Sequence, residues 1–326
     1  MLLNPDLYSP DVATAATRDG FGQALVELAA AQKRVVGLTA DLTESVRMAE
    51  FAEHFPERFF EMGVAEQNMI GVAAGLAANG LIPFAASYAT FSPGRSLDQI
   101  RTSVAISNLN VKIIGAHAGL SVGPDGATHQ ALEDIALMRT LPNMVVVSPA
   151  DNLEAAKATL AIGKHVGPSY LRLHREASPI ITTGSTPFTL GKMSVLRDGE
   201  SVAILATGPI LFQALLAAKI LAQRKIQATV VNVSTIKPLD TVTLARLARN
   251  LPAMVVVEEH QSAGGLFGAI AEWSVANHPL PIASVGVADR FGQSGKVDEL
   301  YEEYGLKAGQ ICLVVERLLK SLKVAR

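Results

Sequence analysis

Six short apolar runs rich in valine and isoleucine recur along the chain, and turn-forming or polar residues follow each one. They lie at residues 35–38, 111–114, 144–147, 202–205, 229–233 and 254–257. Segments with apolar residues at helical spacing lie at residues 21–32, 152–162, 210–224 and 241–250. This alternation predicts an α/β fold in which each sheet is mostly parallel and flanked by helices. Ligands of such sheets gather at the carboxyl ends of the strands, so we expect the site in the turns that follow the runs.

A stretch rich in Thr, Ser, Pro and Gly interrupts the alternation at residues 176–192, with the sequence EASPIITTGSTPFTLGK. It separates two α/β series, so we expect one domain at residues 1–180, a linker at 181–192 and a second domain at 193–326. The length of 326 residues suits this division, because a domain typically takes roughly 100–200 residues. The residues with candidate chemistry come before the linker.

The charge balance excludes several classes of partner. Lys and Arg number 28 against 30 acidic residues, a net charge of −2, which gives no long-range attraction to nucleic acid or to an acidic membrane. The first residues lack the apolar core of a signal peptide, and the single cysteine, Cys312, cannot form an internal disulfide. We therefore expect a cytoplasmic protein with no nucleic-acid or membrane partner.

Residues 69–94 contain no charged side chain, and this stretch is longer than the roughly 20 residues that span a bilayer. Its prolines, glycines and polar residues argue against a continuous membrane helix. We expect instead a buried helix, a turn, a buried strand and a loop. Burial beside another subunit or a ligand would explain the missing charge.

The segment GVAEQNM at residues 63–69 places a carboxylate, Glu66, at the start of an apolar helix of small residues. Two interpretations stay open from the residues alone. Glu66 could be a helix-start carboxylate favoured by the helix dipole, an effect of roughly 0.3–1 kcal/mol. It could also be a buried carboxyl group of raised pKa that shares a proton with a ligand.

A glycine-rich loop, GAHAGLSVGPDGATHQ, follows the run at 111–114 and carries His117, Asp125 and His129. Glycines let the backbone approach a ligand while the side chains point inward, although a flexible turn with solvated histidines is the alternative. The wide spacing of the histidines suits no common zinc site. The Gly-Pro-Asp-Gly turn also lacks the lysine and the Ser/Thr of a phosphate-binding loop.

Two segments of the second half carry less chemistry. Residues 234–240 read as a turn and a helix start, with Pro238 in the first helical turn. Glu258, Glu259 and His260 lie at a strand end, where they could touch a ligand but more readily form a subunit contact.

Four separated segments together resemble the C-terminal half of a transketolase. In chain order they are EMGVAEQNMIGVAAGLAANG, AHAGLSVGPDGATHQALEDIALMR, NVSTIKPLD and VVVEEHQSAGGLFGAIAE. The resemblance covers the chain from Arg18 to its end. It implies a pyrimidine-binding domain followed by a transketolase C-terminal domain, with thiamine diphosphate as cofactor. It also implies an enzyme that transfers a two-carbon ketol unit from a ketose phosphate to an aldose phosphate.

The resemblance implies a role for particular residues at the cofactor. Glu66 takes the position of the glutamate that contacts the aminopyrimidine ring, and Phe91 that of an aromatic residue packed on this ring. Tyr88 and Arg95 belong to the same wall, and Asp41 matches an acid near the cofactor.

At the substrate, the resemblance implies six ligands: Arg18, Ser45 and Arg175 at the phosphate, and His117, Asp125 and His129 at the carbonyl and hydroxyl groups. Glu66, His117 and His129 are then the catalytic side chains. Two departures from the family pattern, Ala118 and Pro124, lie on the substrate side and bear on which sugar is used.

The family's metal motif, a Gly-Asp-Gly followed some tens of residues later by an asparagine, is missing from the chain. Its Asp-Gly pairs at Asp19, Asp125 and Asp198 all lack the first glycine. We therefore expect no metal site in this chain. A partner, an N-terminal transketolase subunit, should hold the diphosphate and a divalent metal (Mg or Ca), and two copies of each chain would form a heterotetramer.

Three other interpretations remain open. The chain could be the beta subunit of a 2-oxo-acid dehydrogenase, which shares the Gly-hydrophobic-Ala-Glu-Gln motif and the domain order. It could be related to a deoxyxylulose-phosphate synthase, which joins pyruvate to an aldose phosphate. It could also be a non-catalytic subunit that only stabilises its partner.

Overall fold

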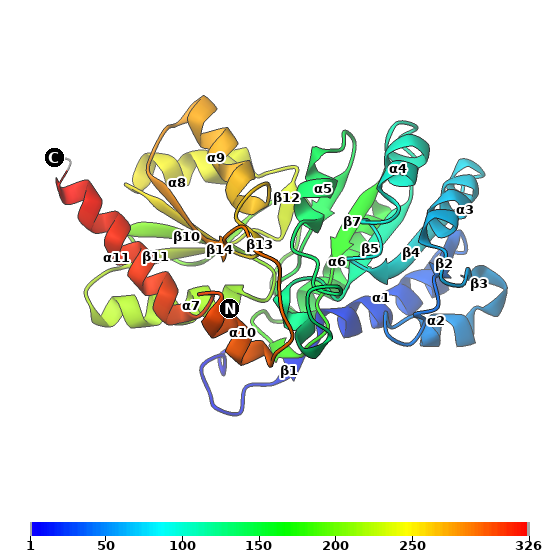
Figure 1. Ribbon diagram of the computed structural model, residues 1–326, viewed down its shortest axis with the longest axis horizontal. Helices are drawn as coiled ribbons and strands as arrows, with labels where there is room; N and C mark the ends of the chain where they lie inside the picture. The colour runs from blue at the N-terminus through cyan, green and yellow to red at the C-terminus, as the bar shows by residue number, and fades with distance from the viewer. Residues whose placement is uncertain (1, 325–326) are drawn as a thin grey trace.

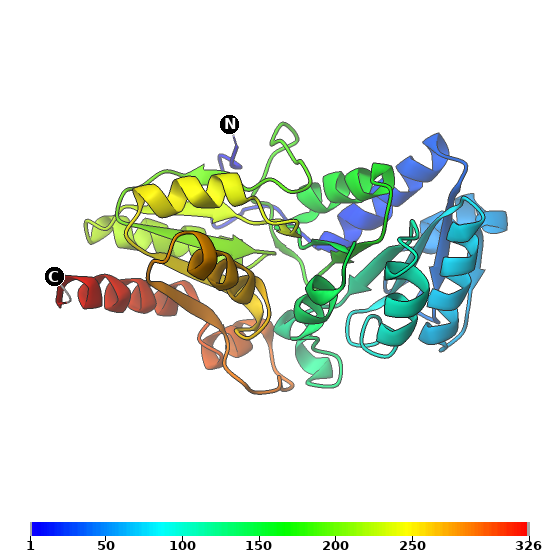
Figure 2. The same ribbon diagram turned by 90° about the horizontal axis from the view of Figure 1, so that it is seen from above.

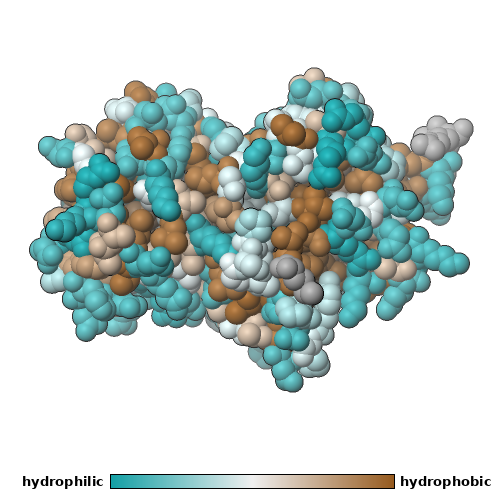
Figure 3. All heavy atoms as spheres, turned by 180° about the vertical axis from the view of Figure 1, so that it is seen from behind, coloured by the Kyte–Doolittle hydropathy of each residue, from teal (hydrophilic) through white to brown (hydrophobic). Residues whose placement is uncertain are grey.

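The computed structural model describes residues 2–324 and contains two mostly parallel sheets side by side, each covered by helices on both faces (Figure 1). This is the α/β architecture that the sequence predicts. Figure 2 shows the same arrangement from above, with the C-terminal helix along the outer edge of the second lobe. On the face in Figure 3, hydrophilic and apolar side chains are interspersed, and apolar groups gather near the middle of the molecule.

The first sheet has seven strands in the order β12-β6-β7-β5-β4-β2-β3, and only β12 is antiparallel to its neighbour. Both faces are buried, so its strands are continuous apolar runs: Ile113 packs into the core on one face and Ile114 into the core on the other. The strands are β2 Val35–Thr39, β3 Phe59–Glu61, β4 Ile82–Tyr88, β5 Lys112–Ala116, β6 Val145–Val147, β7 Ser169–Arg172 and β12 Thr235–Lys237.

Helices α1, α2 and α6 contribute to the core on one face of this sheet, and α3, α5 and the segment of α4 and η2 to the core on the other. They are α1 Thr17–Ala31, α2 Ala49–His54, α3 Glu66–Ala78, α4 Leu97–Gln99, η2 Ile100–Ala105, α5 Asp134–Thr140 and α6 Asn152–Lys164. Two short helices complete the lobe, η1 Pro56–Arg58 and η3 Leu120–Asp125.

The second sheet has five strands in the order β14-β13-β10-β11-β9, parallel except for β9. Helices α8 and α9 cover one face, and α7 and α11 cover the other (Figure 1). The strands are β9 Ser194–Arg197, β10 Val202–Thr207, β11 Ala228–Asn232, β13 Met254–Gln261 and β14 Ile282–Val287. The helices are α7 Leu211–Gln223, α8 Thr241–Asn250, α9 Leu266–Asn277, α10 Val297–Glu303 and α11 Ala308–Val324.

Residues from the second half complete the first sheet, which corrects one prediction. The segment at 234–240 does not start a helix: β12 pairs antiparallel with β6, and the helix α8 begins only at Thr241, with Asp240 as its N-cap. Lys237 fixes this strand because its Nζ donates to the carbonyl oxygens of Arg139 and Leu141. A two-stranded ladder of β1 Thr14–Ala15 and β8 Ser178–Pro179 closes the start of the first lobe.

Several local predictions are confirmed. The helix α3 begins at Glu66, and the charge-free stretch is indeed a helix, a turn and the buried strand β4. The helix predicted at 152–162 is α6, and the side chain of Asp151 caps it by accepting a hydrogen bond from the backbone N–H of Glu154. Within residues 2–324, no helix is both long enough and apolar enough to cross a membrane.

Candidate active site

Glu66 is a buried carboxylate at the first position of α3. Its side chain is 6% exposed, and Arg95 Nη1 lies 3.0 Å from its Oε1. Arg95 is held in turn because its carbonyl oxygen accepts a hydrogen bond from Gln67. An open depression of about 500 Å³ lies in front of these residues and is also lined by Val64 and Asn68. The ion pair occupies Oε1, so Oε2 is available to a ligand.

An aromatic wall continues from this ion pair along the carboxyl end of β4. The Arg95 guanidinium lies 4.2 Å from the centre of the Phe91 ring, and Phe91 stacks on Tyr88 at 5.6 Å. His117 also stacks on Tyr88, with 3.8 Å between ring centres, and His129 meets the Phe91 ring edge-on at 5.3 Å. The structure therefore joins five residues that the sequence predicts at one site.

His117 is kept neutral by its surroundings. Burial and the nearby guanidinium groups of Arg18, Arg175 and Arg47 lower its pKa to about 3. Its Nε2 lies 3.3 Å from Arg18 Nη1, and its Nδ1 has no hydrogen-bond partner within residues 2–324. A neutral imidazole among three cations can bind a polar ligand without adding charge, and the cations around it would attract an anionic group.

Arg18 and Ser45 meet at the amino end of α1. Arg18 donates a hydrogen bond from Nη1 to the carbonyl oxygen of Ser45 at 2.8 Å. Arg47, two residues farther along, donates to Asp19 in the first turn of α1. The sequence reasoning missed Arg47, although its place just after Ser45 in the loop that follows β2 was an available signal.

Arg175 and Asp125, two of the predicted substrate ligands, form a second ion pair. Arg175 Nη1 lies 3.2 Å from Asp125 Oδ2 and donates to the carbonyl oxygen of Val122 at 3.1 Å. Arg175 follows β7, and Asp125 ends η3, so the pair joins two of the carboxyl-end turns. Gly123 within η3 has a φ of +76°, a conformation that a side chain would strain.

Asp41 is an exposed residue just after β2, with a φ of +60°. The contact that the structure gives it is to Glu61, whose Oε1 accepts the Asp41 backbone N–H at 2.7 Å. The sequence analysis also did not identify Glu61 as a residue near the candidate site. Partial burial would raise its pKa, but hydrogen bonds from Thr39, Asp41, Thr43 and Gly63 hold the pKa below its usual value. Asp41 thus lies at the expected edge of the sheet without joining the chain of contacts from Glu66 to His117.

The structure corrects the interpretation of residues 258–260 as a subunit contact. Glu258, Glu259 and His260 are at most 1% exposed inside this chain, because the strand that carries them ends between the two lobes. Within residues 2–324, no three His, Cys, Asp or Glu side chains gather as a metal site.

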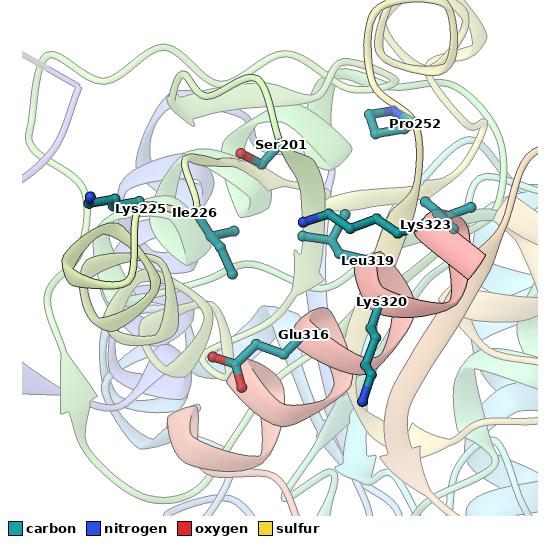
Figure 4. Close-up of a pocket in the computed structure, with 9 residues that line it drawn as sticks. Ser201, Lys225, Ile226, Pro252, Glu316, Leu319, Lys320 and Lys323 are labelled. Carbon is teal, nitrogen blue, oxygen red and sulfur yellow. The ribbon is translucent and has the colours of Figure 1, made fainter. Parts of the chain in front are cut away.

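A second depression lies far from these side chains, between α11 and the amino ends of β10 and β11 (Figure 4). It measures about 570 Å³, and Lys225, Lys320 and Lys323 lie at it beside Leu319. Because ligands of parallel sheets gather at the opposite, carboxyl edge, we place the candidate active site at Glu66 and His117 instead.

Two family models match successive parts of the chain. The transketolase pyrimidine-binding domain matches residues 13–180, and the transketolase C-terminal domain matches residues 191–311. The chain belongs to the transketolase family. The resemblance drawn from the four sequence segments is thereby confirmed, and membership implies thiamine diphosphate as the cofactor.

Relatives match nearly the whole chain, and two of them are similar to it in length. A Methanocaldococcus jannaschii protein named as a transketolase C-terminal section is 44% identical over 94% of this chain and 96% of its own. A 6-deoxy-6-sulfo-D-fructose transketolase subunit of Clostridium sp. is 44% identical over 90% of this chain and 91% of its own. A 1-deoxy-D-xylulose-5-phosphate synthase of Dictyoglomus turgidum is 37% identical over 93% of the present chain, but the match covers only 49% of the synthase.

A solved structure gives the same result. A split-gene transketolase determined as an inactive beta4 tetramer superimposes with a TM-score of 0.87 and 42% identity, over 94% of this chain and 99% of the other. The two-domain fold is therefore that of a split transketolase subunit.

Proposed function

We propose that this chain is the C-terminal subunit of a thiamine-diphosphate-dependent transketolase made of two polypeptides. The enzyme transfers a two-carbon ketol unit from a ketose phosphate to an aldose phosphate. The observation that carries the proposal is the continuous chain of contacts from the buried Glu66 carboxylate through Phe91 and Tyr88 to a neutral His117 among arginines.

The residues present fit the aminopyrimidine end of the cofactor. A ring nitrogen needs a hydrogen-bond partner, which Glu66 supplies, and a flat heterocycle needs an aromatic face, which Phe91 supplies. Thr90 adds a buried hydroxyl that has no partner within the described residues. Tyr88 and Arg95 complete the wall, and Asp41 lies at the rim. When bound, thiamine diphosphate would supply a nucleophilic carbon and a cationic thiazolium ring that takes up the electron pair released as a ketose carbon–carbon bond breaks.

Glu66 acts by holding a hydrogen bond to the ring nitrogen, which favours the reactive tautomer of the ring. The apolar helix α3 and the Phe91 ring keep water from this bond, and a dry site strengthens an electrostatic interaction.

At the other end of the site, two groups of side chains hold the sugar phosphate. Arg18 and Arg175 bind the phosphate, with Ser45 beside Arg18, so that remote binding energy orients the reacting carbon. His117, His129 and Asp125 bind the carbonyl and hydroxyl groups, and the two histidines move protons there.

A partner subunit completes the enzyme by holding the diphosphate and a divalent metal. The helix α3 offers a surface for it. Gly71 and Gly75 are exposed, and apart from their chain neighbours and the backbone of α3, no atom of residues 2–324 lies within 4 Å of a Cβ placed on either. Small residues let a second backbone approach closely, and the surrounding stretch has no charge to desolvate. Two copies of each chain form the complex. The buried free thiol of Cys312 suits a reducing compartment such as the cytoplasm.

The test is reconstitution. We expect the purified chain alone to give no thiamine-dependent cleavage of ketose phosphates, and activity to appear when a neighbouring-gene product with the Gly-Asp-Gly motif is added. Activity of the chain alone would reject the division of labour between two subunits. Turnover of pyruvate with an aldose phosphate, but not of ketose phosphates, would indicate a synthase instead, and release of CO2 from a 2-oxo acid would indicate a dehydrogenase subunit.

A further inference from the structure

Glu259 is a fully buried carboxylate of the second half that reaches into the first. It lies near the end of β13 and is 1% exposed. Its Oε1 accepts the backbone N–H of Ser121 at 2.5 Å, and its Oε2 accepts the Tyr301 hydroxyl at 2.7 Å. His174 Nε2 lies 3.4 Å from the same Oε2. Ser121 and His174 belong to the first half, and Tyr301 to α10 of the second.

The two first-half partners of Glu259 each adjoin the substrate side of the candidate site. Ser121 lies in η3, the short helix that ends at Asp125. His174 precedes Arg175 in the chain, and its backbone N–H donates to Thr17 Oγ1, beside Arg18. One carboxylate therefore fixes the backbone next to the Asp125–Arg175 pair and the turn next to Arg18.

The loop is shaped around this carboxylate. Gly119 has a φ of +83°, and a Cβ built on it would lie 2.4 Å from Glu259 Oε1, so no side chain fits between the loop and the acid. The backbone of Glu259 is held as well, because Arg172 Nη2 donates to its carbonyl oxygen at 2.9 Å. Burial would raise the pKa of Glu259, but His174, Arg172 and Tyr301 lower it below its usual value. The group stays ionised and accepts hydrogen bonds at both oxygens.

Packing and hydrogen bonds together hold the loop that contains η3. A cavity of about 280 Å³ lies behind η3, and Ser121, His174 and Tyr301 all line it. Leu120 and Val122 are fully buried, and Gln130 Nε2 donates to the carbonyl oxygens of Leu120 and Gly123. Glu259 adds to these contacts a hydrogen bond from the second half to the loop backbone at Ser121, on the side where the cavity leaves the loop without packed side chains.

We propose that Glu259 is a positioning residue through which the second domain sets the substrate-phosphate end of the active site. The expected effect of Glu259 on substrate binding rests on the proposed transketolase function. Its expected effect on the position of the loop does not. Glu259 touches neither substrate nor cofactor. It acts by holding Ser121 and His174, and through them Asp125 and Arg175.

The first experiment measures the loop in the isolated chain. Glu259→Gln keeps the shape but replaces one acceptor oxygen with a donor, so we expect hydrogen–deuterium exchange in residues 119–130 to rise about tenfold. The matched control is Glu258→Gln. Glu258 is equally buried on the same strand, but it accepts hydrogen bonds from Leu266 and Phe267 inside the second half. Unchanged exchange in folded Glu259→Gln, or an equal rise in both variants, would overturn the proposal.

The second experiment measures substrate binding in the reconstituted enzyme. We expect Glu259→Gln to raise the KM for the ketose phosphate about tenfold, with kcat within about threefold and thiamine diphosphate affinity unchanged. A loss of kcat or of cofactor binding without a change in KM would reject the positioning role. If reconstitution gives no transketolase activity, the proposed function fails while the exchange experiment still decides the role of Glu259 in the loop.

A milder variant guards against misfolding. Tyr301→Phe removes one donor to Glu259 and leaves the carboxylate and its contact with Ser121 in place. We expect exchange and KM to change in the same direction as in Glu259→Gln, by about threefold. No change in either would count against the network.

Discussion

His117 shows how strongly surroundings can change a single side chain. Its sequence position in a glycine-rich loop predicted a functional histidine, but only the folded chain brings Arg18, Arg47 and Arg175 around it and buries the ring. Those cations come from distant parts of the chain, so no local pattern could have revealed that the ring is neutral. The same holds for Glu66: the sequence located it at a helix start, whereas its ion pair with Arg95 follows from the path of the turn after β4.

A pH experiment tests the state of His117. Because its folded pKa of about 3 lies below the ordinary value near 6.5, the unfolded chain binds a proton between these values that the folded chain does not. The contribution of His117 to stability is therefore complete above about pH 6.5 and falls as the pH decreases, by up to about 1.4 kcal/mol per pH unit.

We expect His117→Asn, which cannot titrate and tolerates the positive φ of this position, to lose less stability than the parent chain between pH 7 and pH 5. Urea unfolding at each pH gives the comparison. His260, whose pKa is also lowered by burial, to about 4, contributes to both proteins and cancels. Equal slopes in the two proteins would mean that His117 is charged in the folded state.

Glu66→Gln tests the cofactor end at the same scale. The amide keeps the size of the side chain but cannot give a proton to a ring nitrogen, so we expect kcat of the reconstituted enzyme to fall by roughly two orders of magnitude or more. Unfolding in urea should show that the variant remains folded. Glu57→Gln, an exposed carboxylate in η1, serves as the control and should keep full activity. Near-normal turnover of Glu66→Gln would reject the assignment.

At the scale of helices and strands, periodicity predicted most elements because each has a strong local signal. The helix α8, for example, occupies residues 241–250 as the spacing of its apolar residues indicated. The strand β12 was missed because it is only three residues long and its partner, β6, lies far away in the sequence. Pairing with a distant edge strand depends on tertiary structure, so a short segment flanked by polar residues gives no local signal for it.

A Gly→Ala substitution should have opposite effects on stability at two glycines that lie in different helices. In α1, a Cβ on Gly20 would lie 1.9 Å from the carbonyl oxygen of Asn152, so Gly20→Ala must push α1 and α6 apart and should cost about 1–3 kcal/mol or more. In α3, a Cβ on Gly75 meets nothing within 4 Å. Gly75→Ala should therefore stabilise the isolated chain by up to about 1 kcal/mol, the difference in helix propensity.

Urea unfolding of the isolated chain measures both variants. The same Gly75→Ala protein also tests the proposed partner surface, because a methyl group that is harmless in the free chain should weaken assembly if another backbone packs on α3. Destabilisation of the free chain by Gly75→Ala would show that this helix face is already occupied.

At the scale of the whole molecule, the two lobes share more than a linker. Strand β12 from the second half pairs in the first sheet, and one apolar core joins α3 and α5 with α8 and α9. The buried Glu154 in α6 also accepts hydrogen bonds from Asn232 and Ser234 across the lobes. The domain boundaries at 1–180 and 193–326, with a linker at 181–192, stay a prediction, while these contacts join the two lobes into one packed body.

We therefore expect the chain to unfold in a single step. Fluorescence of Trp273, in α9, reports on the second lobe, and far-ultraviolet circular dichroism reports on both. Because the shared core would be exposed if either lobe opened alone, the two signals should change at the same urea concentration. A fluorescence transition well separated from that of circular dichroism would show that the lobes unfold independently.

The α/β class and most of the helices and strands could be predicted from the sequence, because hydrophobic periodicity and turn residues are local properties of the chain. The family motifs, which are local as well, gave the candidate site residues. The folded chain was needed to see that β12 joins the first sheet, that Arg47 approaches His117, and that Glu259 reaches the glycine-rich loop. Those contacts join residues far apart in sequence, and burial and charge depend on every group packed nearby.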